Sequence, residues 1–395
     1  MNKQWAVLIL AALSALPARP QARNVILFIG DGGGVTSLNA ASIYGYGKPQ
    51  ALYIQSMPNV GLADTSTAIE WVTGAEAAAS AMATGKKGRN GVLSLSPTAG
   101  KEVNEGEIYK TVLEYAEEKG LATGLVENNK EGLLYDAVAA FYSHANEGFS
   151  DLDIYHQFLK PRFGDGPDVV LATSNSKLNE AVPGGIEAIG GDLKAKGYTF
   201  ARTMDEVSRL DATRTRVVGM LHTDDFDMAA AVRQAVALLS RNPKGFFLVV
   251  HSDCHLAKTR PSLVRLVDLD KAVRAVGEDN KRDTLIIYTA DHGYALYVKG
   301  EKSTEALKAT DHKRIVEAIH LEDQHTAEEV PVAAIGPGSD RVKGFMSNTD
   351  IFSGHDGRFR LGPALKRRNR EEEKTDENDG SCSDDVLCRL PGVQG

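Results

Sequence analysis

Two short apolar runs that each lead into an aspartate constrain the fold of this chain more than any other feature. Asp31 follows the run 24–29, and Asp291 and His292 follow the run 284–289 in the same way. Such runs are typical of buried strands, so both aspartates are expected at strand ends. Ligands of open α/β sheets bind in the crevice outside the carboxyl ends of the strands, and the two distant segments are therefore predicted to meet there. A cation held at that place would have three or four protein ligands.

Apolar runs alternate with amphipathic stretches along the whole chain, which is the pattern of a parallel sheet with crossover helices. The predicted strands are 24–30, 121–127, 168–172, 216–221, 245–251, 284–290 and 330–335. The predicted helices are 35–44, 75–84, 106–119, 225–240 and 261–277. We therefore expect an α/β fold with a large, mostly parallel central sheet and helices on both faces, formed by residues 23–353 as one domain.

The two ends of the chain differ in composition from the rest. Residues 1–22 combine a basic start with an apolar stretch too short to span a bilayer, which is the pattern of a signal peptide. We expect cleavage after Ala18 or Ala22 and export of the protein, to the periplasm or outside the cell. A buried first strand or helix is the alternative, but the first convincing strand begins only at Asn24. Residues 354–395 are rich in charged side chains and are expected to form a disordered tail.

Charge and cysteine content exclude some classes of function. The net charge of −8 and the pI of about 5.7 do not suit a nucleic-acid-binding surface. The sequence also shows no apolar stretch long enough for a transmembrane helix. Cys254 has no evident partner, whereas Cys382 and Cys388 enclose a short loop that a disulfide can close in an oxidising compartment.

Four segments together carry a family resemblance. The segments are 24–34 (NVILFIGDGGG), 72–85 (VTGAEAAASAMATG), 284–293 (TLIIYTADHG) and 325–338 (HTAEEVPVAAIGPG). In this order they resemble four signature segments of bacterial alkaline phosphatases. The resemblance spans roughly residues 23–353. It implies an alkaline-phosphatase-like fold.

The resemblance also implies a metal-dependent chemistry. In that family two Zn²⁺ and one Mg²⁺ lie above the central sheet, and a serine at a helix N-terminus attacks the phosphorus of a phosphate monoester. Asp31, Asp291 and His292 would belong to one zinc site, with Asp31 also reaching the magnesium, and His325 would belong to the other zinc site. Taken singly, Asp31 also suits a turn, and the pair at 291 and 292 suits a helix N-cap. The four segments in order favour the metal site. The expected ligand is a small phosphorylated molecule or phosphate, and a homodimer is left open.

The chain departs from the family at the nucleophile. Family members carry Asp-Ser where this chain has Gly74 and Ala75, and alanine has no oxygen with which to attack. Loss of the catalytic serine lowered kcat on the order of 10⁶-fold in another hydrolase, so hydrolysis of phosphate monoesters is expected to be strongly impaired. The nearest hydroxyls do not replace it, because Thr73 precedes the helix and Ser80 lies more than one turn inside it. No residue is therefore assigned as catalytic.

A second departure follows the predicted strand 245–251. Where the family has a glutamate for magnesium and then an aspartate and a histidine for zinc, this chain has His251, Leu256 and Arg260. His251, Asp253 and His255 alternate, so in an extended segment they share one face and can rebuild a metal site with His325. The alternative is a polar strand end that faces water. It is favoured because the potential ligands no longer stand at the spacing of the family pattern.

A third departure concerns the residues that hold phosphate and magnesium. In and just beyond the segment 124–144, the chain lacks the family's magnesium-ligating hydroxyl and its phosphate-binding arginine, and Glu147 would repel an anion. Zn²⁺ is expected at reduced occupancy, whereas the missing ligands argue against Mg²⁺. The favoured interpretation is an exported family member with strongly impaired activity. The alternatives are a residual or altered phosphoester hydrolase that uses metal-bound water, and a non-catalytic binding protein.

Overall fold

A computed structural model describes most of the predicted domain. The described residues are 22–100, 106–130, 132–134, 136–174, 176–210, 216–255, 258–280, 282–299 and 312–352. All of them belong to one compact unit. The predicted signal segment up to residue 21, the predicted tail and the cysteine pair within that tail lie outside the described residues. No helix among the described residues is both long enough and apolar enough to cross a lipid bilayer.

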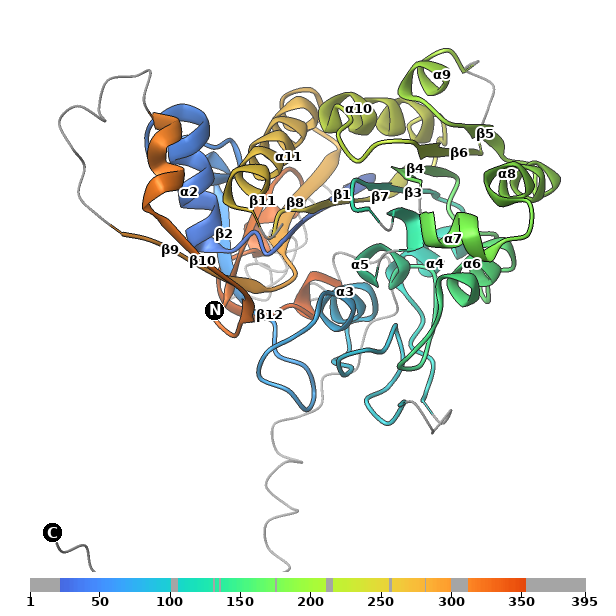
Figure 1. Cartoon of the computed structure of the whole chain (residues 1–395), viewed down its shortest axis with the longest axis horizontal. Coiled ribbons are helices and arrows are strands. Elements are labelled where there is room, and N and C mark those ends of the chain that lie inside the picture. Colours follow the sequence, from blue (N-terminus) through green and yellow to red (C-terminus); the bar gives the residue numbers. More distant parts are fainter. Residues whose placement is uncertain are drawn as a thin grey trace, which may run out of the picture. The chain divides into compact units, whose positions relative to one another are not determined.

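One sheet of ten strands forms the centre of the fold (Figure 1). Its strands are β1 (Asn24–Asp31), β2 (Asn59–Asp64), β3 (Ala122–Glu127), β4 (Val169–Thr173), β5 (Thr199–Ala201), β6 (Val217–Leu221), β7 (Phe246–Asp253), β8 (Thr284–Ala290), β11 (Val330–Ile335) and β12 (Gly344–Ser347). Their spatial order is β12-β2-β11-β8-β1-β7-β3-β4-β6-β5. Within this sheet β11 runs antiparallel to β2 and β8, and the other neighbouring strands are parallel. A separate antiparallel pair consists of β9 (Gly293–Val298) and β10 (Ile319–Thr326).

Helices cover both faces of the sheet, as Figure 1 shows for α10 and α11 on one side and for α3 to α6 on the other. The helices are α2 (Val35–Tyr46), α3 (Ala75–Thr84), α4 (Val112–Glu118), α5 (Asp136–Ala139), α6 (Asp151–Leu159), α7 (Ser176–Ala181), α8 (Gly185–Ala195), α9 (Met204–Ser208), α10 (Met228–Leu239) and α11 (Thr259–Asn280). Short 3-10 turns occupy Ile54–Ser56, Gly132–Leu134, His312–Ala318 and Ser339–Arg341.

Alternation along the central strands divides the apolar core into two layers. In β1, Leu27 and Ile29 belong to the layer that contains the buried residues of α3 and α4. Ile26 and Phe28 belong to the layer that contains those of α2, α10 and α11. Because successive strand side chains point to opposite faces, a strand buried on both faces is apolar throughout, which explains the continuous apolar runs in the sequence.

The structure confirms the predicted fold class and all of the predicted strands, with ends shifted by up to two residues. Sequence analysis missed the short strands β2, β5 and β12, the pair β9 and β10, and several helices including α6 and α8. The predicted helix 106–119 was wrong at its start, because α4 begins only at Val112. Thr111 and Glu114 form a capping box there, in which each side chain accepts a hydrogen bond from the other residue's backbone N–H. This Thr-x-x-Glu pattern is visible in the sequence and marks the true start of the helix.

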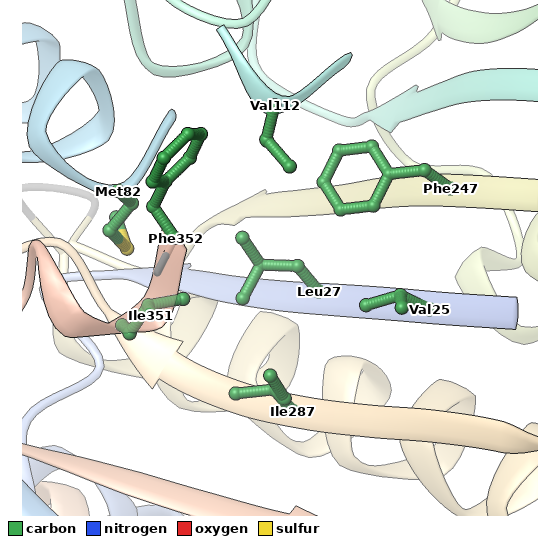
Figure 2. A pocket seen from close by; sticks show the side chains of 8 residues that line it. All are labelled: Val25, Leu27, Met82, Val112, Phe247, Ile287, Ile351 and Phe352. Carbon is green, nitrogen blue, oxygen red and sulfur yellow. The ribbon is translucent and has the colours of Figure 1, made fainter. Parts of the chain in front are cut away.

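A small apolar cavity of about 20 Å³ lies between the central strands and the end of the described chain (Figure 2). Its lining is Val25, Leu27, Met82, Val112, Phe247, Ile287, Ile351 and Phe352. The side chains converge from β1, β7, β8, α3, α4 and the segment after β12. A water molecule would find no polar side chain to bind in such a cavity, so the cavity is expected to stay dry.

We expect Leu27→Ala to lower the free energy of unfolding by about 2–5 kcal/mol, because the space left by the buried side chain joins the existing cavity. Urea denaturation followed by circular dichroism measures the change. Val264→Ala, at a half-exposed position of α11, is the matched control and should stay within about 0.5 kcal/mol of the wild type. Equal effects of the two substitutions would contradict this account of the core.

Candidate metal centre

Acidic side chains and imidazoles gather at the carboxyl ends of the adjacent strands β8, β1, β7 and β3. The register of the sheet pairs Asp31 of β1 with Asp253 of β7, and it pairs His251 of β7 with Glu127 of β3. Asp291 follows β8 directly. Parallel pairing therefore places residues that are far apart in sequence side by side at one edge of the sheet.

The two segments that end in aspartate do meet. The backbone N–H of Gly32 donates to Asp291 Oδ1 across 3.2 Å, and His292 Nε2 lies 2.9 Å from Asp31 Oδ1. Gly32 has a φ of +66°, and a Cβ built on it would lie 2.7 Å from Cβ of His255. Glycine at this position therefore allows both the left-handed turn and the close approach of the His255 segment.

His325 lies in the same cluster, to which the antiparallel pair of β9 and β10 brings it. The strand β9 begins directly after His292, and its antiparallel partner β10 brings His325 opposite Tyr294. The rings of His292 and His325 stack with centroids 3.5 Å apart. His325 Nδ1 lies 2.9 Å from the carbonyl oxygen of Thr73, which ties the cluster to the loop before α3.

The alternating segment of β7 belongs to the cluster. His251 is fully buried and Asp253 is 6% exposed, so the interpretation of these residues as a strand end that faces water was wrong. His251 Nε2 lies 3.7 Å from Asp291 Oδ2 and 3.9 Å from Asp31 Oδ2. His255 lies beyond the end of the strand, and its Nε2 is 3.1 Å from Asp31 Oδ1. The potential ligands in this segment stand at other positions than in the family pattern, but their side chains still belong to the cluster.

The described residues contain three overlapping groups in which the candidate ligand atoms all lie within 4.8 Å of one another. The groups are His255, His292 and His325; Asp31, His251 and Asp291; and Asp31, Asp253 and His255. Every residue that the sequence singled out as a candidate metal ligand thus belongs to at least one group. Imidazole nitrogens dominate the first group and carboxylate oxygens the other two.

Mutual attraction of acids and imidazoles sets the protonation of the cluster. Burial raises the pKa of Asp31, but the hydrogen bonds and charges of His255 and His292 outweigh burial and hold the pKa well below its usual range. Burial lowers the pKa of His255, but Asp31 and the other carboxylates raise it to about 10. The pKa of His292 is raised to about 9 against burial, by the charge of Asp291 and by Asp31. Burial and the charge of His292 lower the pKa of His325, which favours its neutral form.

The N-terminus of α3 lies beside this cluster and presents Ala75 as its first residue. The hydroxyls nearby are engaged elsewhere: Thr73 Oγ1 donates to the carbonyl oxygen of Gly74, and Ser80 Oγ accepts from the N–H of Ser94. Both hydroxyl-bearing residues are buried. Asn90 Oδ1 accepts from the N–H of Gly74 across 2.7 Å and fixes the loop that leads into the helix.

Sequence analysis did not single out two charged residues of this region. Glu127 is fully buried, and its Oε2 lies 2.6 Å from Nδ1 of His251. Arg265 of α11 donates to the carbonyl oxygen of Asn128 across 2.8 Å and lies 3.8 Å from Asp253 Oδ2. A signal for Glu127 was present, because it ends the apolar run of β3 as Asp31 ends that of β1. Arg265 had none, since an arginine in a long amphipathic helix is usually solvated.

Comparisons with known proteins identify the family of this chain. The family model of alkaline phosphatase matches residues 22–159 and 222–320. The chain is 26% identical to alkaline phosphatase H of Pseudomonas aeruginosa, with 86% of each chain covered, and 27% identical to alkaline phosphatase of Escherichia coli, with 87% of each covered. It is 27% identical to a streptomycin-6-phosphate phosphatase of Streptomyces griseus, over 84% of this chain and 89% of that one.

Solved structures share the fold. The alkaline phosphatase of Thermus thermophilus superposes with a TM-score of 0.72 at 20% identity, over 89% of this chain and 94% of that chain. A cold-active alkaline phosphatase of Shewanella sp. gives a TM-score of 0.71 at 20% identity, over 86% of this chain and all of that chain. The family model covers more than half of the residues of this chain, and the relatives match it over most of its length. The chain therefore belongs to the alkaline phosphatase family.

Proposed function

We propose that this protein retains the divalent-cation pocket of its family but is strongly impaired in hydrolysing phosphate monoesters through a protein nucleophile. The observation that carries the proposal is the position of Ala75, a side chain without oxygen at the helix end beside the cluster. The proposed ligand remains a small phosphorylated molecule or phosphate, in keeping with the family. Export to the periplasm or outside the cell remains part of the proposal, on the basis of the pattern of residues 1–22.

The residues of the cluster fit a divalent cation. Asp291 Oδ2 and Asp253 Oδ1 are buried and accept no hydrogen bond among the described residues, and their nearest imidazole nitrogens, on His251 and His255, lie 3.7 and 3.8 Å away. Carboxylate oxygens in such a position are costly unless they bind a cation or a charged partner. Asp31, Asp291 and His251 would hold one cation, and His255, His292 and His325 a second. Mixed oxygen and nitrogen ligands suit Zn²⁺, whereas Mg²⁺ prefers oxygen ligands, so we propose Zn²⁺.

A bound cation and groups of the chain would together contact a phosphate. A bound Zn²⁺ supplies Lewis-acid polarisation of phosphoryl oxygens and lowers the pKa of water. The first backbone N–H groups of α3, which have no acceptor within the helix, suit a phosphate oxygen. Glu147, in the region where the family has its phosphate-binding arginine, lies 3.6 Å from Arg89 Nη2, so its negative charge is partly balanced. Neither residue supplies the bidentate grip on phosphate that a free guanidinium would give.

A second candidate is an altered phosphoester hydrolase in which water replaces the serine. The group of His255, His292 and His325 favours it, because three imidazoles with an open position are a known ligand set of hydrolytic zinc sites. In this case a phosphate diester or another oxyanion ester is a substrate to test beside the monoester. A non-catalytic binding protein that uses the same pocket is the remaining alternative.

We expect turnover of a chromogenic phosphate monoester to be lower by a factor on the order of 10⁴–10⁶ than in a serine-bearing family member, because the nucleophile is absent. Initial rates on a monoester and a diester, with Asp31→Asn as the variant that weakens cation binding, measure this. Monoester turnover in the range of serine-bearing members would contradict the proposal. Diester turnover that Asp31→Asn abolishes would favour the second candidate.

Restoring the family residues by Gly74→Asp with Ala75→Ser should recover little activity. A Cβ at Gly74 would clash with the carboxylate of Glu76, which then has to move, and the new aspartate would lie beside this like charge. The ligands around His251 and the missing arginine are also not restored. Monoester kinetics of this double variant, with Ala75→Ser alone as the control, test the expectation. Recovery to within tenfold of a serine-bearing member would show that the rest of the site is intact.

Without a cation, stability should fall as pH rises from about 6.5 towards 10. The folded-state pKa values of His255 and His292 lie above the unfolded value of about 6.5, so their charged forms stabilise the protein at low pH and this contribution is lost through pH 9 to 10. Urea denaturation in chelator at pH 6, 8 and 10 measures the loss. Asp31→Asn, which removes the carboxylate partner of both imidazoles, should flatten the dependence. A pH-independent midpoint in the wild type would contradict this account.

A further inference from the structure

A buried pair formed by Glu127 and His251 lies behind the cation pocket. The two residues are cross-strand neighbours at the ends of β3 and β7, and both side chains are fully buried. Glu127 Oε2 lies 2.6 Å from His251 Nδ1. The other carboxylate oxygen of Glu127 accepts a hydrogen bond from the backbone N–H of Asn129. Both oxygens of this acid thus lie in contact with fixed groups.

We propose that Glu127 is a positioning residue that orients the ring of His251, so that Nε2 faces the pocket between Asp31 and Asp291 and serves as a ligand for a divalent cation. This inference rests on the cation pocket of the proposed function. It adds a residue that acts through His251 and does not itself contact the cation.

The geometry of the ring supports this role. The two nitrogens of an imidazole lie on different edges, and contact of Nδ1 with Glu127 leaves Nε2 directed to the carboxylates. The distances from Nε2 to Asp291 Oδ2 and Asp31 Oδ2, 3.7 and 3.9 Å, are too long for good hydrogen bonds. Two ligand atoms that share a tetrahedral Zn²⁺ lie roughly 3.4 Å apart, so the same distances are close to those of ligands around one cation. His251 Nε2 therefore lies at a distance from both aspartates that suits shared binding of one cation.

The chemistry of Glu127 points the same way. The rest of β3 is buried, and an ionisable side chain at such a strand end is costly unless a partner needs its charge. Metal-binding histidines commonly place a carboxylate against their second ring nitrogen, which fixes the tautomer and strengthens the ligand. The carboxylate of Glu127 lies one strand away from Asp31 and Asp291, behind the imidazole of His251.

The test measures cation binding directly. Protein stripped with chelator is titrated with Zn²⁺ by calorimetry and with Co²⁺ by visible absorption, which reports the coordination of the ion. We expect Glu127→Leu to weaken Zn²⁺ binding by 10- to 100-fold, as loss of such partners does elsewhere, and to change the Co²⁺ spectrum. Glu127→Gln keeps the size and an oxygen that accepts from Nδ1–H, so it should retain most of the affinity.

The chain offers a matched control. Glu114 and His144 form another buried pair, in which Glu114 Oε1 lies 2.9 Å from His144 Nε2 and each side chain is 2% exposed. Neither residue belongs to the three ligand groups. Glu114→Gln and Glu114→Leu should alter the unfolding midpoint and leave Zn²⁺ affinity and the Co²⁺ spectrum unchanged. A purely structural role of Glu127 would give the same pattern as Glu114.

Two failures are distinguishable. If the wild type binds neither ion, the cation pocket itself is refuted, and this inference with it. If the wild type binds and folded Glu127→Leu binds equally well with the same spectrum, only the role of Glu127 is refuted. If circular dichroism shows that the leucine variant does not fold, Glu127→Ala replaces it under the same criteria. A Glu127→Gln variant that binds Zn²⁺ less well than Glu127→Ala would also overturn the inference.

Discussion

The site depends on one constraint: carboxylates at the ends of adjacent parallel strands must be buried without being left uncompensated. Asp31 and Asp291 are completely buried, and Glu127 is buried one strand further along the sheet. An isolated buried carboxylate is very costly, so each must face an imidazole, a backbone N–H or a cation. The imidazoles of His251, His255 and His292 supply part of this compensation, and the raised pKa values of His255 and His292 are its electrostatic signature. The sheet register, the glycine turn after β1 and the return of β10 all serve to bring these groups together.

The same constraint bears on the proposed combination of a retained cation pocket and a missing nucleophile. Removing an acid from the cluster would leave its imidazole partners buried with less compensation, so the pocket is costly to dismantle piece by piece. Replacing a serine at the start of α3 by alanine has no such cost, because Ala75 is buried in an apolar layer and helix formation favours alanine. The proposed loss of the nucleophile is therefore compatible with a stable fold and with the proposed cation pocket beside it.

Sequence reasoning succeeded where a short pattern determines a local structure. Continuous apolar runs predicted the central strands, since a strand covered on both faces carries apolar side chains at every position. It failed where tertiary contacts decide, as in β2 and β12, which are short and join the sheet through pairing with distant strands. The start of α4 was misplaced although the capping box of Thr111 and Glu114 was readable. The changed register of the segment from His251 to Asp253 suggested exposure, but its neighbours on β1 and β3 bury it.

By itself the sequence determined the positions of the central strands along the chain, the acids at the ends of those strands, the family resemblance and the alanine at the start of α3. These follow from residue identity and from patterns only a few residues long. Only the tertiary structure decided which side chains share a pocket, because Asp31, Glu127, His251, Asp291 and His325 come from segments whose neighbours are set by strand order and register. The sequence shows that Glu127 ends a strand. That it lies against the imidazole of His251 is a property of parallel pairing between β3 and β7.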